Sequence, residues 1–312
     1  MQRITSQNLA LTTAAPAAQV SLPLSSLNEG RTSSYLYLRL SGLLTLPVIA
    51  AGNLEPEHVT QCIRSIQLQY GKGSININGD DLDRYMRARW AIRSGNNNRT
   101  YPQNAATQIS HVLAIPLNPS ICDIKKDRAY RIPSIMLRGQ QLQCTVDFGA
   151  LAADFTSFAG TIEVWANAED PIKDGSDGTS PMFINLTATA DLNGSELAFP
   201  RADLIINSNT NAYTEFRVDN VVQTNITPAL HAQFKRWEHA GANGYRYDET
   251  RTSLVDPALY LYPLYVAGVR TTPQMVVFYD RRDYKNPGAG AFVRLENRNA
   301  NLLPVVTEYG VS

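Results

Sequence analysis

Short runs of alternating apolar and polar residues recur along the whole chain. The clearest is Ile63 to Tyr70, where every second residue from Ile66 onward is apolar and the residues between are Gln. Alternation with a period of two places the apolar side chains on one face, so it predicts a half-buried β-strand. A glycine-containing turn at Gly71 and a second alternating run, Ser74 to Asn78, follow directly. Together the two runs predict a β-hairpin.

The same criteria predict strands throughout the chain. In the first half they cover 34–40, 109–117, 142–148 and 161–166; in the second half they cover 183–190, 204–207, 215–222, 259–266, 274–279 and 291–296. Few segments between them have the length of the helical crossover that parallel strands require. Many short strands separated by turn signals therefore predict an all-β fold of sandwiches or barrels.

Two segments have the pattern of a short amphipathic helix. Leu82 to Trp90 reads LDRYMRARW, and Leu230 to Trp237 reads LHAQFKRW. In each segment Leu and the apolar residue four positions on share one helical face, while the basic residues fall elsewhere. A helix start near Thr227 is expected for the second segment, because Thr is a good cap and Pro228 suits the first turn.

The two helical segments belong to a longer internal repeat. Their tryptophans lie 147 residues apart, and the same distance separates Pro116 from Pro263, each near the end of a predicted strand. The runs YLYLRL from Tyr35 and FINLTA from Phe183 lie 148 residues apart. Similarity at a fixed distance indicates one structural unit used twice. The runs IEVWAN (162–167) and FVRLEN (292–297) are candidates for the closing strands of the two units.

Composition divides the chain into four segments. Residues 1–30 are rich in Ala, Ser, Thr and Gln, which predicts an extended N-terminal arm. Residues 31–169 form the first predicted barrel and 181–312 the second, each with one short helix. Residues 170–180 contain DGSDGTS and are followed by Pro181, which is typical of a linker.

The charge balance excludes one class of function. The chain has 28 basic and 28 acidic residues, so its net charge is zero. A protein that coats nucleic acid carries a basic excess, because neutralised phosphates supply most of the binding energy. Direct packaging of a genome is therefore not expected. No window approaches 18 consecutive apolar residues, so we expect no membrane-spanning helix.

The residue types that carry catalysis or bind metals are present without the spacing their chemistry needs. The four histidines, at 58, 111, 231 and 239, form no HExxH motif, and the acidic loop around Asp174 lacks the ligand spacing of a calcium loop. GKGS at 71–74 matches neither a dinucleotide-binding nor a Walker loop. The three cysteines, at 62, 122 and 144, contain no CxxC and are expected to be reduced and buried. We therefore predict no catalytic residues, no metal site and no cofactor.

One cluster of charged residues does suggest binding. Five arginines fall within sixteen residues, interleaved with Tyr85 and Trp90: Arg84, Arg87, Arg89, Arg93 and Arg99. They are candidate contacts to an anionic partner, which could be lipid head groups, phosphates or carboxylates of a neighbouring subunit. The alternative is a solvated helix face whose long side chains only cover apolar surface.

These features together resemble the double jelly-roll major capsid proteins of tailless icosahedral viruses with an internal membrane. The resemblance rests on the duplicated β unit, the strand–turn–strand–helix block in each copy (66–90 and 215–237), the matched strands at Pro116 and Pro263, and the polar arm. Tectivirus, corticovirus and finnlakevirus phages have such proteins, and a finnlakevirus-like phage is the preferred match.

The resemblance implies a structural virion protein and not an enzyme. Two jelly-roll barrels per subunit would give a pseudo-hexameric homotrimer that tiles an icosahedral shell around the internal membrane. The implied partners are the chain itself, other virion proteins such as a penton or minor membrane protein, and inner-membrane lipid through the N-terminal arm, with no sequence-specific nucleic-acid binding. The implied location is the virion capsid, after synthesis in the host cytoplasm.

Two other classes of function remain open from the residues. A carbohydrate- or receptor-binding two-domain β-sandwich would use aromatic side chains that stack on sugars, and the candidates are Tyr260, Tyr262, Tyr265 and Trp165. An enzyme on a jelly-roll scaffold, such as a cupin, would need a close cluster of histidines and a glutamate, which His58 and His111 do not provide.

Overall fold

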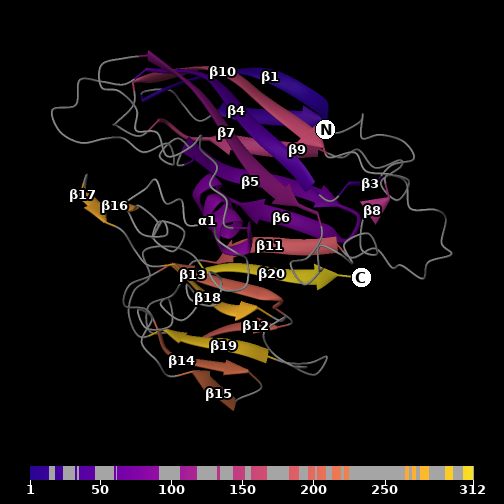
Figure 1. Ribbon diagram of the computed structural model, residues 1–312, viewed down its shortest axis with the longest axis vertical. Coiled ribbons are helices and arrows are strands. Elements are labelled where there is room, and N and C mark those ends of the chain that lie inside the picture. The colour runs from indigo at the N-terminus through magenta and orange to yellow at the C-terminus, as the bar shows by residue number, and fades with distance from the viewer. Residues whose placement is uncertain are drawn as a thin grey trace, which may run out of the picture. The chain divides into compact units, whose positions relative to one another are not determined.

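The computed structural model folds into two compact units built almost entirely of strands (Figure 1). Unit 1 comprises 1–86, 93–187 and 310–312, and unit 2 comprises 87–92 and 188–309. The structure describes residues 1–13, 18–23, 32–33, 35–45, 60, 62–90, 106–117, 132–133, 143–151, 156–166, 183–189, 196–200, 202–208, 213–218, 221–224, 264–266, 269–271, 275–280, 292–297 and 305–311. The predicted linker, 170–180, and the predicted second helix, 230–237, lie outside these ranges.

Eight long strands build unit 1. They are β1 (Gln2–Thr12), β2 (Ala18–Pro23), β4 (Tyr35–Thr45), β5 (Ile63–Tyr70), β6 (Gly73–Ile77), β7 (Ala106–Pro116), β9 (Gln143–Phe148) and β10 (Ser157–Ala166). Two short strands, β3 (Thr32–Ser33) and β8 (Ile132–Pro133), pair with each other. The single described helix is α1 (Gly79–Trp90), and β11 (Phe183–Thr189) comes last.

The eight long strands form two antiparallel sheets with jelly-roll topology. One sheet has the order β1-β10-β4-β7, and the other contains the run β2-β9-β5-β6. Numbered along the chain, the two orders are first–eighth–third–sixth and second–seventh–fourth–fifth. Except for the β5–β6 hairpin, every connection passes from one sheet to the other, which is the double Greek-key arrangement of a jelly roll.

The core of unit 1 follows from the alternation along each strand. In β4 the leucines at 36, 38, 40 and 44 are buried, and the residues between them face outward. Gly42 and Gly160 lie opposite each other in the register of β4 and β10. A Cβ atom on Gly160 would lie 2.6 Å from the Cα of Gly42 and 2.8 Å from the ring of Phe158. Glycine at 160 therefore makes room for that buried ring, and glycine at 42 allows the close approach of the β10 backbone at Ala159 and Gly160.

The N-terminal residues differ from the extended arm that their composition predicts. β1 pairs with β10 along its whole length, and β2 pairs with β9, so residues 2–12 and 18–23 are strands of the first barrel. Leu9 and Leu11 of β1 and Leu22 of β2 are buried in its core. The composition was misleading because a few buried apolar side chains suffice when a strand lies at the side of an existing sheet.

Helix α1 begins three residues earlier than predicted. The Asn78 side chain caps it: Oδ1 accepts a hydrogen bond from the Asp81 backbone N–H at 2.7 Å, and Asp80 and Asp81 lie in the first turn. Both features stabilise a helix N-terminus. Leu82 and Met86 are buried on one face, as their spacing predicts. The Ala114 N–H of β7 donates to the Met86 sulfur at 3.2 Å, so α1 covers the outer edge of that strand.

The strand order in unit 2 repeats part of that in unit 1. Its strands are β12 (Glu196–Pro200), β13 (Leu204–Ser208), β14 (Tyr213–Val218), β15 (Val221–Thr224), β16 (Leu264–Val266), β17 (Val269–Thr271), β18 (Met275–Asp280), β19 (Phe292–Asn297) and β20 (Val305–Val311). β12-β19-β14 has the connectivity of β1-β10-β4, and the β13–β18 pair has that of β2–β9. β20 pairs with β13, and the short β16 and β17 pair with each other.

The repeat is therefore real, but its predicted alignment was wrong in one place. Tyr35 begins β4, whose counterpart in unit 2 is β14. Phe183 instead begins β11, which pairs in parallel with β6. The predicted closing strands, by contrast, are equivalent. In its sheet β10 lies between β1 and β4, and β19 lies between β12 and β14, which are the corresponding strands of unit 2. The single strand predicted over 215–222 is also two, since β14 and β15 form a hairpin.

Candidate functional site

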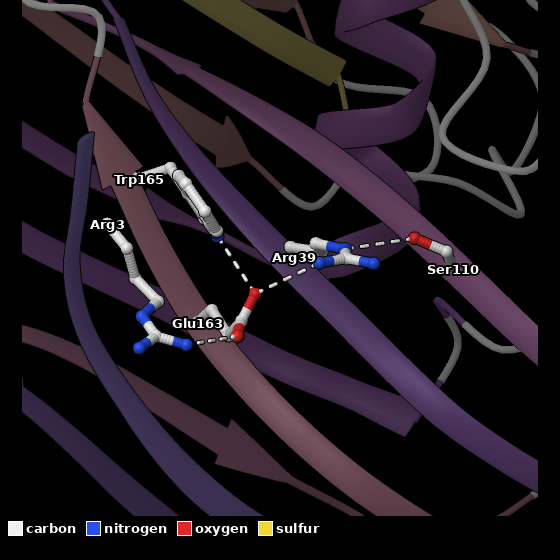
Figure 2. Close-up of polar contacts among 5 residues, drawn as sticks. All are labelled: Arg3, Arg39, Ser110, Glu163 and Trp165. Carbon is white, nitrogen blue, oxygen red and sulfur yellow. Dashed lines mark hydrogen bonds and ion pairs between the residues drawn. The ribbon is translucent and has the colours of Figure 1, made fainter. Parts of the chain in front are cut away.

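The outer face of the β1-β10-β4-β7 sheet carries few charges. In the four strands the formally charged residues are Arg3, Arg39 and Glu163, and these three lie in one cluster (Figure 2). Strand register explains why they meet. Arg39 of β4 is opposite Glu163 of β10, and Arg3 of β1 is opposite Trp165, two residues further along β10. Residues at alternate positions of β10 share a face, so all four side chains project outward.

The Glu163 carboxylate is the centre of the cluster. Arg3 Nη1 contacts its Oε1 at 3.4 Å, and Arg39 Nη1 contacts its Oε2 at 3.3 Å. Trp165 Nε1 donates to Oε2 at 2.9 Å, and Arg39 Nε donates to the Ser110 hydroxyl on β7 at 3.1 Å. The cluster therefore links all four strands, and Figure 2 shows both guanidinium groups directed at the same carboxylate.

Exposure differs sharply among these three charged side chains. The Glu163 side chain is 9% exposed, whereas Arg39 is 39% and Arg3 is 57% exposed. Burial acts to raise the pKa of the Glu163 carboxyl, but the hydrogen bonds from Trp165 and Arg3 and the positive charges of Arg39 and Arg3 outweigh it, so this pKa lies below its usual value. The cluster thus holds one anion and two cations, and the cations are its exposed part.

The rest of this face combines aromatic, aliphatic and small residues with uncharged polar ones such as Asn8 and Gln108. Tyr35 and Tyr37 are half-buried with ring centroids 6.4 Å apart, and Trp165 is opposite Tyr37 in the register. Leu43 is 45% exposed, and Met1 is the other exposed large apolar residue among the described residues. An apolar side chain this exposed on a sheet that is poor in charge differs from an ordinary solvent-facing surface.

The outer face of the other unit 1 sheet is different in kind. Its outward positions on β2, β5 and β9 include Gln19, Gln67 and Asp147. Gln19 Nε2 and Ser65 Oγ donate to the two oxygens of Asp147 at 2.8 and 2.6 Å. This surface has the polar character expected for contact with water. In the described residues, outward-facing aromatic side chains are thus confined to one of the two sheets, whereas an exposed arginine, Arg64 of β5, also lies on the other.

The predicted arginine cluster near α1 is placed only in part. Arg84 is completely buried and forms an ion pair with Asp81, one helical turn earlier. Arg84 therefore does not reach the surface that the cluster was expected to present. Arg87 and Arg89 lie in the last turns of α1, whereas Arg93 and Arg99 lie outside the described residues. A contact role for these four remains a prediction.

One of the histidines and two of the cysteines considered from the sequence can be placed in the described residues. Within these ranges no three His, Cys, Asp or Glu side chains gather as a metal site would require. His111 of β7 is buried opposite Leu40, and burial lowers its pKa to about 4 against a smaller opposing effect of Asp83. Burial raises the pKa of the Cys62 and Cys144 thiols to about 12, so neither is a reactive nucleophile.

Of the four aromatics proposed from the sequence to stack on sugars, the described ranges contain two. Tyr260 and Tyr262 lie outside them, Tyr265 is in β16 of unit 2, and Trp165 is in β10 of unit 1. No helical segment in those ranges has the length and hydrophobicity needed to cross a bilayer.

The Arg3–Arg39–Glu163 cluster was not predicted from the sequence. Alternation in 34–40 and 161–166 places Arg39 and Glu163 on the outward faces of their strands, so each could be recognised as a side chain that does not point into the core. Their meeting depends on which strands are neighbours, since they are 124 residues apart. Local pattern contains no information on that pairing.

The comparisons with known proteins agree with the architecture. The crystal structure of the STIV major capsid protein superposes with a TM-score of 0.57 at 12% identity, covering 98% of this chain and 95% of that one. The atomic structure of Sulfolobus Turreted Icosahedral Virus gives 0.54 at 12% identity, covering 98% and 89%. The major capsid protein P2 of bacteriophage PM2 gives 0.43 at 11% identity, covering 98% and 97%.

At 12% identity these similarities establish the fold, which is the double jelly roll predicted from the sequence. The conclusion rests on the first two structures, whose scores exceed 0.5. No protein-family model matches the chain, and no curated protein matches its sequence.

Proposed function

We propose that this chain is a structural subunit of an icosahedral virus capsid and acts by self-association rather than by catalysis. The observation that carries the proposal is the full-length match to the STIV major capsid protein, since 98% of this chain and 95% of that chain superpose. The net charge of zero supports a shell that does not itself neutralise nucleic acid.

The finer part of the proposal concerns the assembly. Two barrels per chain support a trimer with six barrels, a pseudo-hexamer suited to tiling an icosahedral facet. An internal membrane, a penton or minor membrane protein as partner, and origin in a finnlakevirus-like phage remain predictions from the resemblance. Lipid contact through the N-terminal segment has less support, because its described strands belong to the first barrel.

The native mass in solution tests the proposal. One chain is 34.5 kDa, so a trimer has a mass of 103.5 kDa. Light scattering behind a sizing column should show this species or larger shells that persist on dilution, and electron microscopy should show six-lobed particles. A monomer at every concentration, with or without added salt and lipid, would contradict the assembly. A glycan array then tests the carbohydrate-binding alternative.

A further inference from the structure

We infer that the outer face of the β1-β10-β4-β7 sheet is a contact surface between copies of this chain. In this contact the exposed Arg3 and Arg39 form ion pairs with an acidic side chain of the second copy. The inference rests on the proposed function and assigns the surface through which it acts. It starts from the outward aromatic residues of this face, because charge alone does not distinguish the two sheets: the four strands of the other sheet carry two charged residues, Arg64 and Asp147.

The aromatic and arginine residues on this face are of the types that protein interfaces favour. Interface cores are depleted of charged residues and enriched in Tyr, Trp and Arg, and binding energy concentrates in those three types. This face presents Tyr35, Tyr37 and Trp165 together with the exposed Leu43 and the two arginines. The glutamine-rich face of the other sheet has the exposed Arg64, but its described outward positions include no aromatic residue and no exposed large apolar side chain.

The size of the face is sufficient for a specific contact. Three of its four strands have 11 residues and the fourth has 10. At about 4.8 Å between strands and about 3.3 Å per residue, the face covers on the order of 600 Å². Stable protein interfaces bury about 800 Å² per partner, so this face supplies most of one.

Charge indicates what the second copy contributes. The two arginines share one carboxylate, so the cluster has a formal excess of one positive charge, on its exposed side chains. The whole chain is neutral, so the rest of the same chain has a matching acidic excess. A second copy can therefore supply the acidic group, but from a different part of its surface. A contact between two different surfaces is heterologous, and such contacts form a ring when the rotation between successive copies closes.

The test compares paired variants on the two sheets. Leu43→Lys and Arg3→Glu alter exposed positions of the proposed face, whereas Gln67→Lys and Gln67→Glu introduce the same side chains on the exposed outer face of the other sheet. Light scattering and sedimentation across a concentration series should show self-association at least tenfold weaker for both face variants and unchanged for both controls. Thermal melts of each variant identify any failure to fold, and the variant that folds decides the result.

The possible outcomes separate this inference from the proposed function. Wild-type assembly that survives both face variants would overturn the inference alone. A wild-type protein that never associates would overturn the capsid proposal, and this inference with it. If the wild-type chain binds vesicles of anionic phospholipid and Leu43→Lys and Arg3→Glu remove that binding without weakening assembly, lipid occupies the face and the inference is wrong.

Discussion

Arginine has two distinct roles in unit 1, and the difference is set by burial. Arg84 is buried together with its ion-pair partner Asp81. Arg3 and Arg39 both form ion pairs with Glu163, but much of each arginine side chain is exposed to solvent. A buried charge requires its counter-ion, because the loss of one partner leaves the other uncompensated in a low-dielectric interior. A half-exposed cation retains water and can accept another anion.

Replacing Arg84 by Ala should lower the free energy of unfolding by about 3–5 kcal/mol, since Asp81 would remain buried without its counter-ion. The double replacement Asp81→Leu and Arg84→Met should recover most of that loss, because neither charge of the pair is then left without its partner. Urea denaturation followed by circular dichroism measures both. A loss below about 1 kcal/mol for Arg84→Ala would show that the pair is solvated.

His111 is the buried group most sensitive to acid. Its pKa in the folded chain is about 4, below the ordinary value of 6.5, because burial disfavours the charged ring more than Asp83 favours it. The unfolded state therefore binds the proton more readily between these two values. The contribution of His111 to the free energy of unfolding is complete above about pH 6.5 and falls as the pH drops toward 4. Below that pH this group causes no further loss of stability.

We predict that wild-type protein loses about 3 kcal/mol more stability than His111→Gln between pH 7 and pH 4, on the order of the pKa difference multiplied by 1.36 kcal/mol per unit. The comparison with the variant is necessary because Glu163, whose pKa is lowered, also loses stabilisation as pH falls. Urea titrations at several pH values give the two curves. Parallel curves for the two proteins would mean that His111 is protonated without cost in the fold.

At the scale of elements, β1 shows how a strand can be hidden in a polar sequence. Six of its eleven residues are exposed, and just two of the others, Leu9 and Leu11, are buried. β1 is the outermost described strand of its sheet, so one face is solvated and one edge is unpaired in the described part of the chain. Few apolar positions are then sufficient, and alternation is too short to stand out.

Replacing Leu11 by Ala should cost about 2–5 kcal/mol, as for other buried leucines. Ala10→Ser, at the neighbouring exposed position, should have little effect. Removal of residues 1–12 should prevent unit 1 from folding, because β10 would lose one of its two partner strands and the core would lose Leu9 and Leu11. Thermal melting and solubility measure each result. A truncated chain that melts like the wild type would restore the extended arm predicted from composition.

Some elements were well predicted from local pattern. β5 has the predicted boundaries, and Pro116 ends β7 at the edge of its sheet, where a missing N–H costs no ladder hydrogen bond. The start of α1 was missed because Gly79 was interpreted as part of a turn. The Asn78 cap and the two aspartates after it are a recognisable start signal.

At the scale of the whole molecule, two buried thiols report on the integrity of unit 1. Cys62 precedes β5 and Cys144 lies in β9, at 1% and 0% exposure. They belong to one compact unit and lie in or next to neighbouring strands. A reagent can therefore reach either thiol when that part of the sheet opens, and the reactive thiolate forms only after burial is relieved.

In a Cys122→Ser background, Cys62 and Cys144 should react with a disulfide reagent at least about a thousandfold more slowly in native buffer than in denaturing urea. This factor is on the order of the ratio of folded to unfolded molecules at about 5 kcal/mol of stability. Both should react at the same rate, because a single opening exposes both. Mass spectrometry of quenched samples resolves the two sites. Rapid reaction of one thiol with the other protected would show that unit 1 opens in parts.

The chain's own pattern was enough to determine an all-β fold, an internal duplication, the short helix of unit 1 and the absence of catalytic motifs. These follow from alternation, residue spacing and composition, which are local properties of the sequence. The tertiary structure decided which strands are neighbours. It thereby placed the N-terminal residues in the first barrel, buried Arg84, and brought Arg3, Arg39 and Glu163 together from three strands. Strand pairing is a long-range choice that depends on the packing of the whole core, and short-range patterns do not specify it.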